Sequence, residues 1–270
     1  MKKAQRTKEN IIGVALALIL FAIIFAIFAG VVGYLPTSEV RELGKFYLIN
    51  SLNIYEKELW AATPEAVTAI VWDYRGLDTL FETSVFFLAV IGSMAIFRLK
   101  GWVGAEPPRG EGLSSIVRVC VKIMFVLILT ASASLAIHGQ LTPGGGFQGG
   151  ASSSIAPTLI IAAFSAWMLT KLGFRREKLI TFQALGLIII TLTVFIPLIL
   201  GGFLMQNQPK PWSGFPGYPA GQEGFFLGGS LIFYNIGEFF NIAAGFVILF
   251  ILLSIPEQRH IKDISEESEK

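Results

Sequence analysis

The chain has 270 residues, of which 53% are hydrophobic and 15% are charged, with a formal net charge of +2. Soluble domains carry about 25% charged residues, so this composition excludes an ordinary soluble protein and predicts an all-α membrane protein. The small net charge argues against nucleic acid as a partner. One cysteine excludes an internal disulfide, and with only two histidines a protein-built metal site is not expected.

Six apolar stretches are long enough to cross a bilayer as helices, since about 20 residues at ~1.5 Å each span its ~30 Å core. They are residues 11–32, 77–97, 116–137, 151–172, 179–204 and 228–253. The first stretch is too long for a signal-peptide core and has no convincing A-x-A cleavage site, so we expect a retained span. Pro157 and Pro197 lie inside two spans, where membrane helices tolerate kinks.

Basic residues are distributed unevenly between the two sides that six spans define. With the N-terminus inside, 15 of the 21 lysines and arginines fall on the cytoplasmic side and five on the outer side, while Lys122 lies within a span. The positive-inside rule therefore predicts about six transmembrane helices with both termini cytoplasmic.

Proline- and glycine-rich segments suggest how the chain is organised. Residues 100–115 (KGWVGAEPPRGEGLSS) would be a cytoplasmic linker between a two-helix part, residues 1–99, and a four-helix part, residues 116–256. Residues 209–224 form a predicted external loop whose aromatic side chains suit the membrane interface. Residues 257–270 are polar and form a predicted cytoplasmic tail.

The segment HGQLTPGGGFQGG, from His138 to Gly150, contains six glycines. Three of them fit the G-x-G-x-x-G spacing of dinucleotide-binding loops, namely Gly144, Gly146 and Gly149. Such a loop needs a preceding strand, a following helix and an acidic residue about 20 positions later. A predicted membrane span precedes this segment instead, and residues 166–170 contain no acidic residue. The nucleotide-binding interpretation is therefore rejected.

Glycine has two other uses that fit this position. It permits the positive φ values of a tight turn, and it lets two backbones approach closely. Small residues four positions apart also form the packing faces of membrane helices, and Gly149, Gly150, Ser153 and Ser154 provide them. We expect a tight turn followed by a small-residue packing face, with direct contact to a ligand as the alternative.

The same segment resembles a known family. His138-Gly139 followed by LTPGGGFQGG (residues 141–150) is similar to the signature of the B subunit of Mrp-type (Mnh-type) cation/proton antiporters. The module recurs in ferredoxin-linked, membrane-bound hydrogenases and related respiratory complexes. The residues that carry this structural motif are Pro143, Gly144, Gly145, Gly146, Phe147, Gly149 and Gly150.

A second stretch, DYRGLDT (residues 73–79) followed by Glu82, resembles another part of those complexes. In the family it precedes a membrane helix, at the end of the large antiporter subunit or in a small separate subunit. Phe81 departs from the family, which usually has glycine there. The resemblance covers most of residues 67–253, and it implies a fusion of two small subunits joined at the linker.

The resemblance implies the partners as well. They would be other membrane subunits of the antiporter module, the lipid bilayer, Na+ and H+ as transported ions, and a ferredoxin-linked redox module. The chain would carry out no covalent chemistry of its own, and no cofactor motif is present in the sequence.

Ionisable residues at membrane depth are costly and usually face a protein interior or a water-filled path. Glu238 is the clearest case, near the middle of the last span and flanked at i−3 and i+3 by Asn235 and Asn241. We predict that it serves a proton or cation pathway. The alternative is a structural carboxyl that is hydrogen-bonded to a neighbouring helix.

Four further residues are candidates for the same pathway. Glu82 lies one turn into the second span and matches the family, whereas Asp78 could be a helix N-cap. Lys122 could act as a relay or could extend to the cytoplasmic surface. His138 could exchange protons or could be a hydrogen-bonded anchor of the turn.

Three functions compete at this stage. The first is a non-catalytic membrane subunit of an ion-translocating complex that helps to form a hydrophilic path for protons and sodium. The second is a self-contained small transporter or channel, but no inverted repeat of the kind that many transporters display is visible. The third, a membrane enzyme, lacks any metal cluster, nucleophile–base pair or cofactor motif.

Overall fold

The computed structural model describes residues 2–28, 39–53, 55–97, 113–218 and 228–255, of which the first eleven are described by their backbone alone. Within these ranges every regular element is a helix, which confirms the all-α class. Most of the predicted linker 100–115, part of the loop 209–224 and the predicted tail 257–270 lie outside the described residues.

Within the described ranges, four helices are long and apolar enough to cross a membrane. They are α4 (Gly76–Phe97), α5 (Ser115–Ile137), α9 (Arg176–Ile199) and α10 (Leu231–Leu253). A shorter apolar stretch, Gly13–Phe28, belongs to α1 (Lys2–Phe28). These helices confirm a multi-pass membrane protein, while the orientation of the termini stays a prediction.

The fourth predicted span is not one helix. It is divided into α6 (Gly146–Ser153), α7 (Ile155–Ala163) and α8 (Ala166–Lys171). Pro157 is the third residue of α7, where a missing backbone N–H breaks no helical hydrogen bond, so proline suits the start of a new helix. The second break is at Ser165, whose φ of 125° is far from the helical region. The predicted span 151–172 thus consists of successive helices, with one break just before Pro157, where a kink was expected, and a second at Ser165, which the sequence did not indicate.

The chain divides into two compact units, residues 1–45 and residues 46–270. The first contains α1 and the beginning of α2 (Glu42–Ser51). The second contains the remaining helices, among them a short α3 (Ala66–Ala69), whose N-cap is Glu65, and a π-helical segment η1 (Ile70–Tyr74) that leads into α4. The predicted module boundary at residues 100–115 is a separate matter and remains a prediction.

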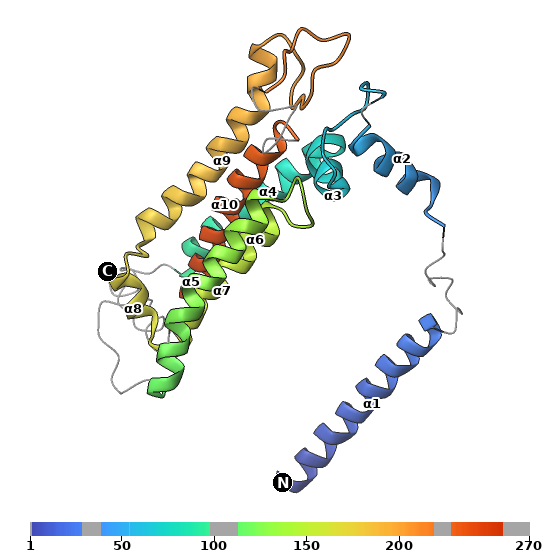
Figure 1. Cartoon of the computed structure of the whole chain (residues 1–270). Coiled ribbons are helices and arrows are strands. Elements are labelled where there is room, and N and C mark those ends of the chain that lie inside the picture. Colours follow the sequence, from blue (N-terminus) through green and yellow to red (C-terminus); the bar gives the residue numbers. More distant parts are fainter. Residues whose placement is uncertain (1, 29–38, 54, 98–112, 219–227, 256–270) are drawn as a thin grey trace. The chain divides into compact units, whose positions relative to one another are not determined.

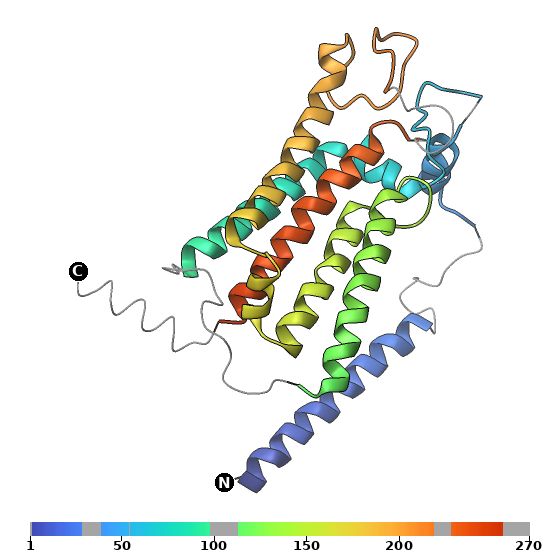
Figure 2. The ribbon, with the colours of Figure 1, turned by 60° about the vertical axis from the view of Figure 1, so that its left-hand side comes forward.

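The helix α10 is the centre of the second unit. It packs against α9, α6, α4 and α5, and in Figures 1 and 2 it runs between α9 and the α6–α7 pair. One core cluster joins α10 to α4, α5, α7 and α8 through residues such as Val90, Val121, Ile160 and Ile248. The central position of α10 explains why its polar residues are shielded from lipid by the chain's own helices.

Cutting the chain within residues 100–112 and expressing both halves together should still give an assembled complex. The reason is that α4, from the first half, packs against α10, from the second half, and apolar packing needs no covalent link. Co-purification of the two halves is the measurement. A matched break inside α10 should abolish assembly, and equal loss with both breaks would contradict the module boundary.

Candidate functional site

Glu238 is buried inside the helix bundle, with 5% of its surface exposed. Asn235 and Asn241, one turn before and after it on α10, are buried as well. Asn241 donates from its Nδ2 to the Thr83 carbonyl on α4, at 3.1 Å. Asn235 Nδ2 and Asn241 Oδ1 are buried without a hydrogen-bond partner. Polar groups of this kind in an apolar bundle are expensive unless water or an ion reaches them.

A cavity of about 200 Å³ lies against Glu238, and we call it the Glu238 pocket. Its walls come from α3, η1, α4, α10 and the glycine-rich segment. The lining residues are Val67, Thr68, Val71, Trp72, Thr79, Glu82, Gly144, Gly145, Phe147, Gln148, Asn235 and Glu238. Residues from both sequence motifs therefore meet at one cavity.

The glycine-rich segment brings the start of α6 to this carboxyl. Gly145 is the N-cap of α6 and has a φ of 144°, a conformation that favours glycine. The Gly146 amide donates to Asn235 Oδ1 at 3.3 Å. A Cβ on Gly146 would lie 2.8 Å from Glu238 Oε2, and the Phe147 backbone amide interacts with the same carboxyl. Backbone N–H groups at a helix start stabilise negative charge.

The two glycines that follow are packing residues. A Cβ on Gly149 would lie 2.7 Å from the Ser132 carbonyl on α5, and one on Gly150 would lie 2.8 Å from Ile242 Cβ on α10. Such distances are too short for real side chains, so α6 sits against both helices only because these positions are glycine. The segment therefore combines a turn and a close-packing face, and the element that precedes it is the helix α5.

Trp72, which lines the Glu238 pocket, belongs to an aromatic pair. The Trp72 ring on η1 stacks on the Tyr234 ring on α10, with centroids 4.5 Å apart and planes 4° apart. The Trp72 indole interacts with the Glu238 carboxyl, although its Nε1 makes no hydrogen bond of normal geometry. The Tyr234 hydroxyl is buried and also has no hydrogen-bond partner.

The structure separates the two acidic candidates of α4. Glu82 is exposed, lines the Glu238 pocket and interacts electrostatically with Glu238. Asp78 is the third residue of α4, so it is not the N-cap. Its carboxylate forms an exposed ion pair with Arg75 and faces a different cavity.

Lys122 and His138 do not line the Glu238 pocket. Lys122 is exposed on α5, with its Nζ 5.9 Å from the centroid of the Phe164 ring. His138 is the C-cap of α5, and its Nδ1 lies 3.0 Å from the Ser134 carbonyl. The backbone carbonyl of His138 accepts from the amides of Leu141 and Thr142, which is the arrangement of a turn anchor. Their roles in a pathway remain predictions.

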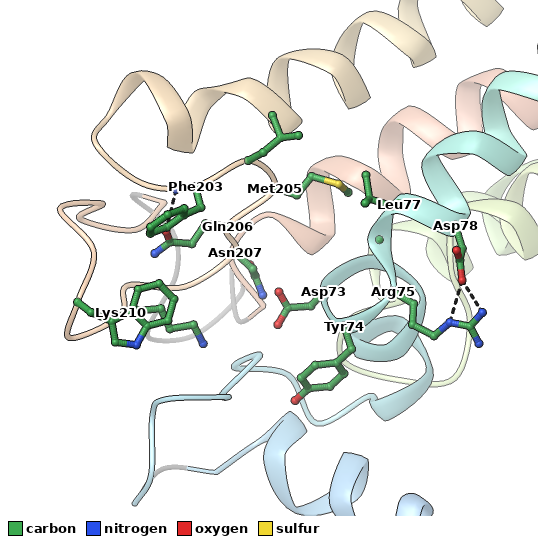
Figure 3. Close-up of a pocket in the computed structure, with 13 residues that line it drawn as sticks. Asp73, Tyr74, Arg75, Leu77, Asp78, Phe203, Met205, Gln206, Asn207 and Lys210 are labelled. Atoms are coloured by element: carbon green, nitrogen blue, oxygen red, sulfur yellow. Dashed lines mark hydrogen bonds and ion pairs between the residues drawn. The ribbon is translucent and has the colours of Figure 1, made fainter.

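A second cavity, of about 630 Å³, lies between η1 and the segment that follows α9. We call it the Asp73 pocket. In Figure 3 the Asp73 carboxylate points toward Asn207, with Lys210 beyond it, while Arg75 and Asp78 pair on the other side. Burial raises the pKa of Asp73 to about 6, although Lys210 and Asn207 both favour its charged form. Burial lowers the pKa of Lys210.

Asp73, Asn207 and Lys210 do not stand out as members of one site in the sequence alone. Asp73 was part of the DYRGLDT stretch, and Lys210 was one of few basic residues on the predicted outer side. Both facts were signals, but nothing in the sequence showed that these residues share a cavity.

The fold and the buried carboxyl define a multi-pass membrane protein with an ionisable site inside its helix bundle. The family follows from the chain itself: residues 116–248 match the family described as a domain related to the MnhB subunit of the Na+/H+ antiporter. Residues 116–248 therefore form a domain of the MnhB-related type, as the glycine-rich motif predicted. The chain is a membrane subunit of the antiporter-module type.

Three similar proteins extend this comparison. An uncharacterized protein of Methanocaldococcus jannaschii is 29% identical over 230 residues, which are 77% of this chain and 83% of the relative. A chain of the membrane-bound sulfane sulfur reductase, an archaeal respiratory membrane complex, is 26% identical with a TM-score of 0.65, covering 91% of this chain and 100% of that chain. A chain of the Mrp complex from Dietzia sp. DQ12-45-1b has a TM-score of 0.61 at 17% identity, covering 91% of this chain and 26% of that chain, and shows the fold alone.

Proposed function

We propose that this chain forms part of a hydrophilic path for protons and sodium ions in the antiporter module of a multisubunit complex, with Glu238 as the titratable relay. Glu82 is the second carboxylate of that path, at the open side of the same pocket. The chain itself carries out no covalent chemistry, and its role is to hold these groups in place within the membrane.

One observation carries this proposal: two carboxylates from different helices, one buried on α10 and one exposed on α4, face a single cavity of about 200 Å³. A purely structural carboxyl would be expected to have its neighbouring donors fully paired. Instead, Asn235 Nδ2 at this cavity lacks a partner, and the Trp72 indole interacts with the carboxyl without a hydrogen bond of normal geometry. Unpaired donors beside a buried carboxyl are the groups that a mobile water or ion would bridge.

The assembly around this path is also a proposal. Large apolar side chains are exposed along α4, α5 and α9, and these faces suit lipid or other membrane subunits of the module. The solved relative belongs to a respiratory membrane complex, which supports a redox module as driver, ferredoxin-linked as in the hydrogenase-related complexes. Purification in mild detergent distinguishes this from a self-contained transporter, because a subunit brings partners and a transporter runs alone.

Glu82→Gln should lower sodium-dependent proton movement by about tenfold or more, because positioned proton transfer contributes on the order of 10²–10⁴ in rate. The measurement uses vesicles that contain the intact complex, with assembly checked by co-purification. Glu177→Gln is the matched control, since Glu177 is an exposed carboxylate at the start of α9, away from the pocket. Equal activity of the two variants would contradict a path through Glu82.

A further inference from the structure

The Asp73 pocket has the composition of an ion-exchange site that is separate from the Glu238 pocket. The Asp73 carboxylate, half-buried on η1, points into the cavity (Figure 3). Across the cavity lies the segment after α9, where Asn207 is 2% exposed and Lys210 is half-buried. A carboxylate, an amide and an ammonium group thus face a shared space of about 630 Å³.

Lys210 lies near Asp73 but does not form an ion pair with it. Its Nζ donates to the Trp60 carbonyl at 3.2 Å. Asn207 donates from its Nδ2 to the Ala61 carbonyl at 2.9 Å and so fixes the same segment. Among the described residues, the one ion pair within 4 Å is Arg75–Asp78. Asp73 therefore interacts with the Asn207 amide and feels the Lys210 charge through space, without a direct ion pair to that lysine.

Charged and titratable groups surround Asp73 from several elements. Tyr74 lies next to it on η1, and Lys210, which also interacts with Glu58, faces it from the α9–α10 segment. From α10, Tyr234 interacts electrostatically with Asp73. The Tyr234 hydroxyl is fully buried and has no hydrogen-bond partner. Tyr234 lines neither cavity, so its hydroxyl is a buried polar neighbour of Asp73 and not a group exposed in the pocket.

The stacked pair of Trp72 and Tyr234 connects the surroundings of the two carboxylates. Trp72 lines the Glu238 pocket, and Asp73, the next residue on η1, lines the Asp73 pocket. Trp72 interacts with Glu238, and Tyr234, which stacks on it, interacts with Asp73. Each ring of the stacked pair thus interacts with a different carboxylate: Trp72 with Glu238, and Tyr234 with Asp73.

We propose that Asp73 is a second exchange site for a small monovalent cation, a proton or a sodium ion, in series with Glu238 and linked to it through the Trp72–Tyr234 stack. This inference rests on the proposed function of Glu238. Lys210 acts as a tethered counter-charge: it keeps Asp73 ionised when no cation is bound and lowers the affinity of Asp73 for one.

The pH dependence of antiport gives the test, and its sign follows from the chemistry. Only ionised Asp73 can accept a cation, so activity should fall as the pH drops through the pKa of Asp73, which is about 6. We call this fall of activity at low pH the acid limb of the pH profile. Lys210→Gln removes a charge that favours ionised Asp73, so the acid limb should move to higher pH by roughly 0.5 pH unit or more. Lys210→Arg keeps the charge and should leave the limb in place.

The experiment measures sodium-dependent proton movement in vesicles with the intact complex, between about pH 5 and pH 9, at two Na+ concentrations. Asp73→Asn should lower the rate by about tenfold or more and remove the acid limb. Glu56→Gln is the control, because Glu56 is an exposed carboxylate in the segment between α2 and α3. If Na+ competes with protons at Asp73, a tenfold rise in Na+ should move the limb downward by up to about one pH unit; a proton-only site predicts no movement.

Each outcome has a separate meaning. Unchanged rate and limb in Asp73→Asn, with activity lost in Glu238→Gln, overturns the Asp73 site and leaves the proposed function standing. Full activity in Glu238→Gln, with a shifted limb in Lys210→Gln, overturns the proposed function instead. If Asp73→Asn fails to assemble, the lysine variants decide: identical acid limbs in Lys210→Gln and Lys210→Arg overturn the proposal.

Discussion

Glu238→Gln should abolish sodium-dependent proton movement, by about a hundredfold or more, while the complex stays assembled. Glutamine has nearly the same shape as glutamate and can still accept the Phe147 amide and the Trp72 indole that interact with this carboxyl. It cannot bind and release a proton. Transport in vesicles and co-purification of partners, measured on the same preparation, separate the loss of the relay from the loss of the fold.

Comparing Glu238→Asp with Glu238→Gln separates a relay from a structural carboxyl, because the two explanations predict opposite orders of activity for these variants. Aspartate is ionisable but one methylene shorter, so a relay should keep partial activity. A structural carboxyl predicts that glutamine is tolerated and that aspartate is worse, because its shorter side chain no longer reaches the start of α6. Full antiport in the glutamine variant would exclude the relay and leave Glu238 as a packing residue.

Gly146→Val should reduce the yield of assembled complex by about tenfold or more, because overpacking costs about 1–3 kcal/mol and sometimes more. A Cβ at this position would collide with the Asn235 carbonyl and would lie 2.7 Å from Glu238 Cβ. The first obstacle is backbone inside the central helix, so it cannot rotate away. Co-purification from detergent extracts is the measurement.

Two further variants, one in the same segment and one control, help to explain the effect of Gly146→Val. Gly145→Val should also prevent assembly, for a different reason, because a β-branched residue resists a φ of 144°. Gly92→Val on α4 is the control, since a Cβ there meets nothing within 4 Å. Normal assembly of Gly145→Val and Gly146→Val with loss of ion transport would instead make the glycine-rich segment a direct contact site.

The features that could be predicted from the sequence are those that the bilayer imposes locally. Long apolar stretches predict spans, because lipid allows few other structures, and α5 and α10 were found within a few residues of their predicted limits. Glu238 stood out because a lone carboxylate in such a stretch is rare. The nucleotide-binding interpretation was rejected because a span precedes the glycines, and the structure has a helix there.

The features that escaped prediction depend on tertiary contacts. Residues around Ser165 are apolar enough for a span, and the backbone turn that ends α7 there leaves no trace in hydropathy. Asp73 and Lys210 are far apart in the sequence and meet only because η1 and the α9–α10 segment fold over the same cavity. A single sequence does not show that two residues so far apart will line the same cavity.

The central position of α10 has a consequence for biosynthesis. Among the described helices of its unit, α10 is the last in the chain, so it leaves the ribosome after the others. The earlier helices must enter the membrane while the groove that will hold α10 is still open, because domains take shape in the order of synthesis. The helix that carries Glu238 is then synthesised last among the described helices, so the proposed relay can form only when α10 joins the helices made before it. A chain that ends before α10 therefore lacks the proposed relay carboxyl altogether.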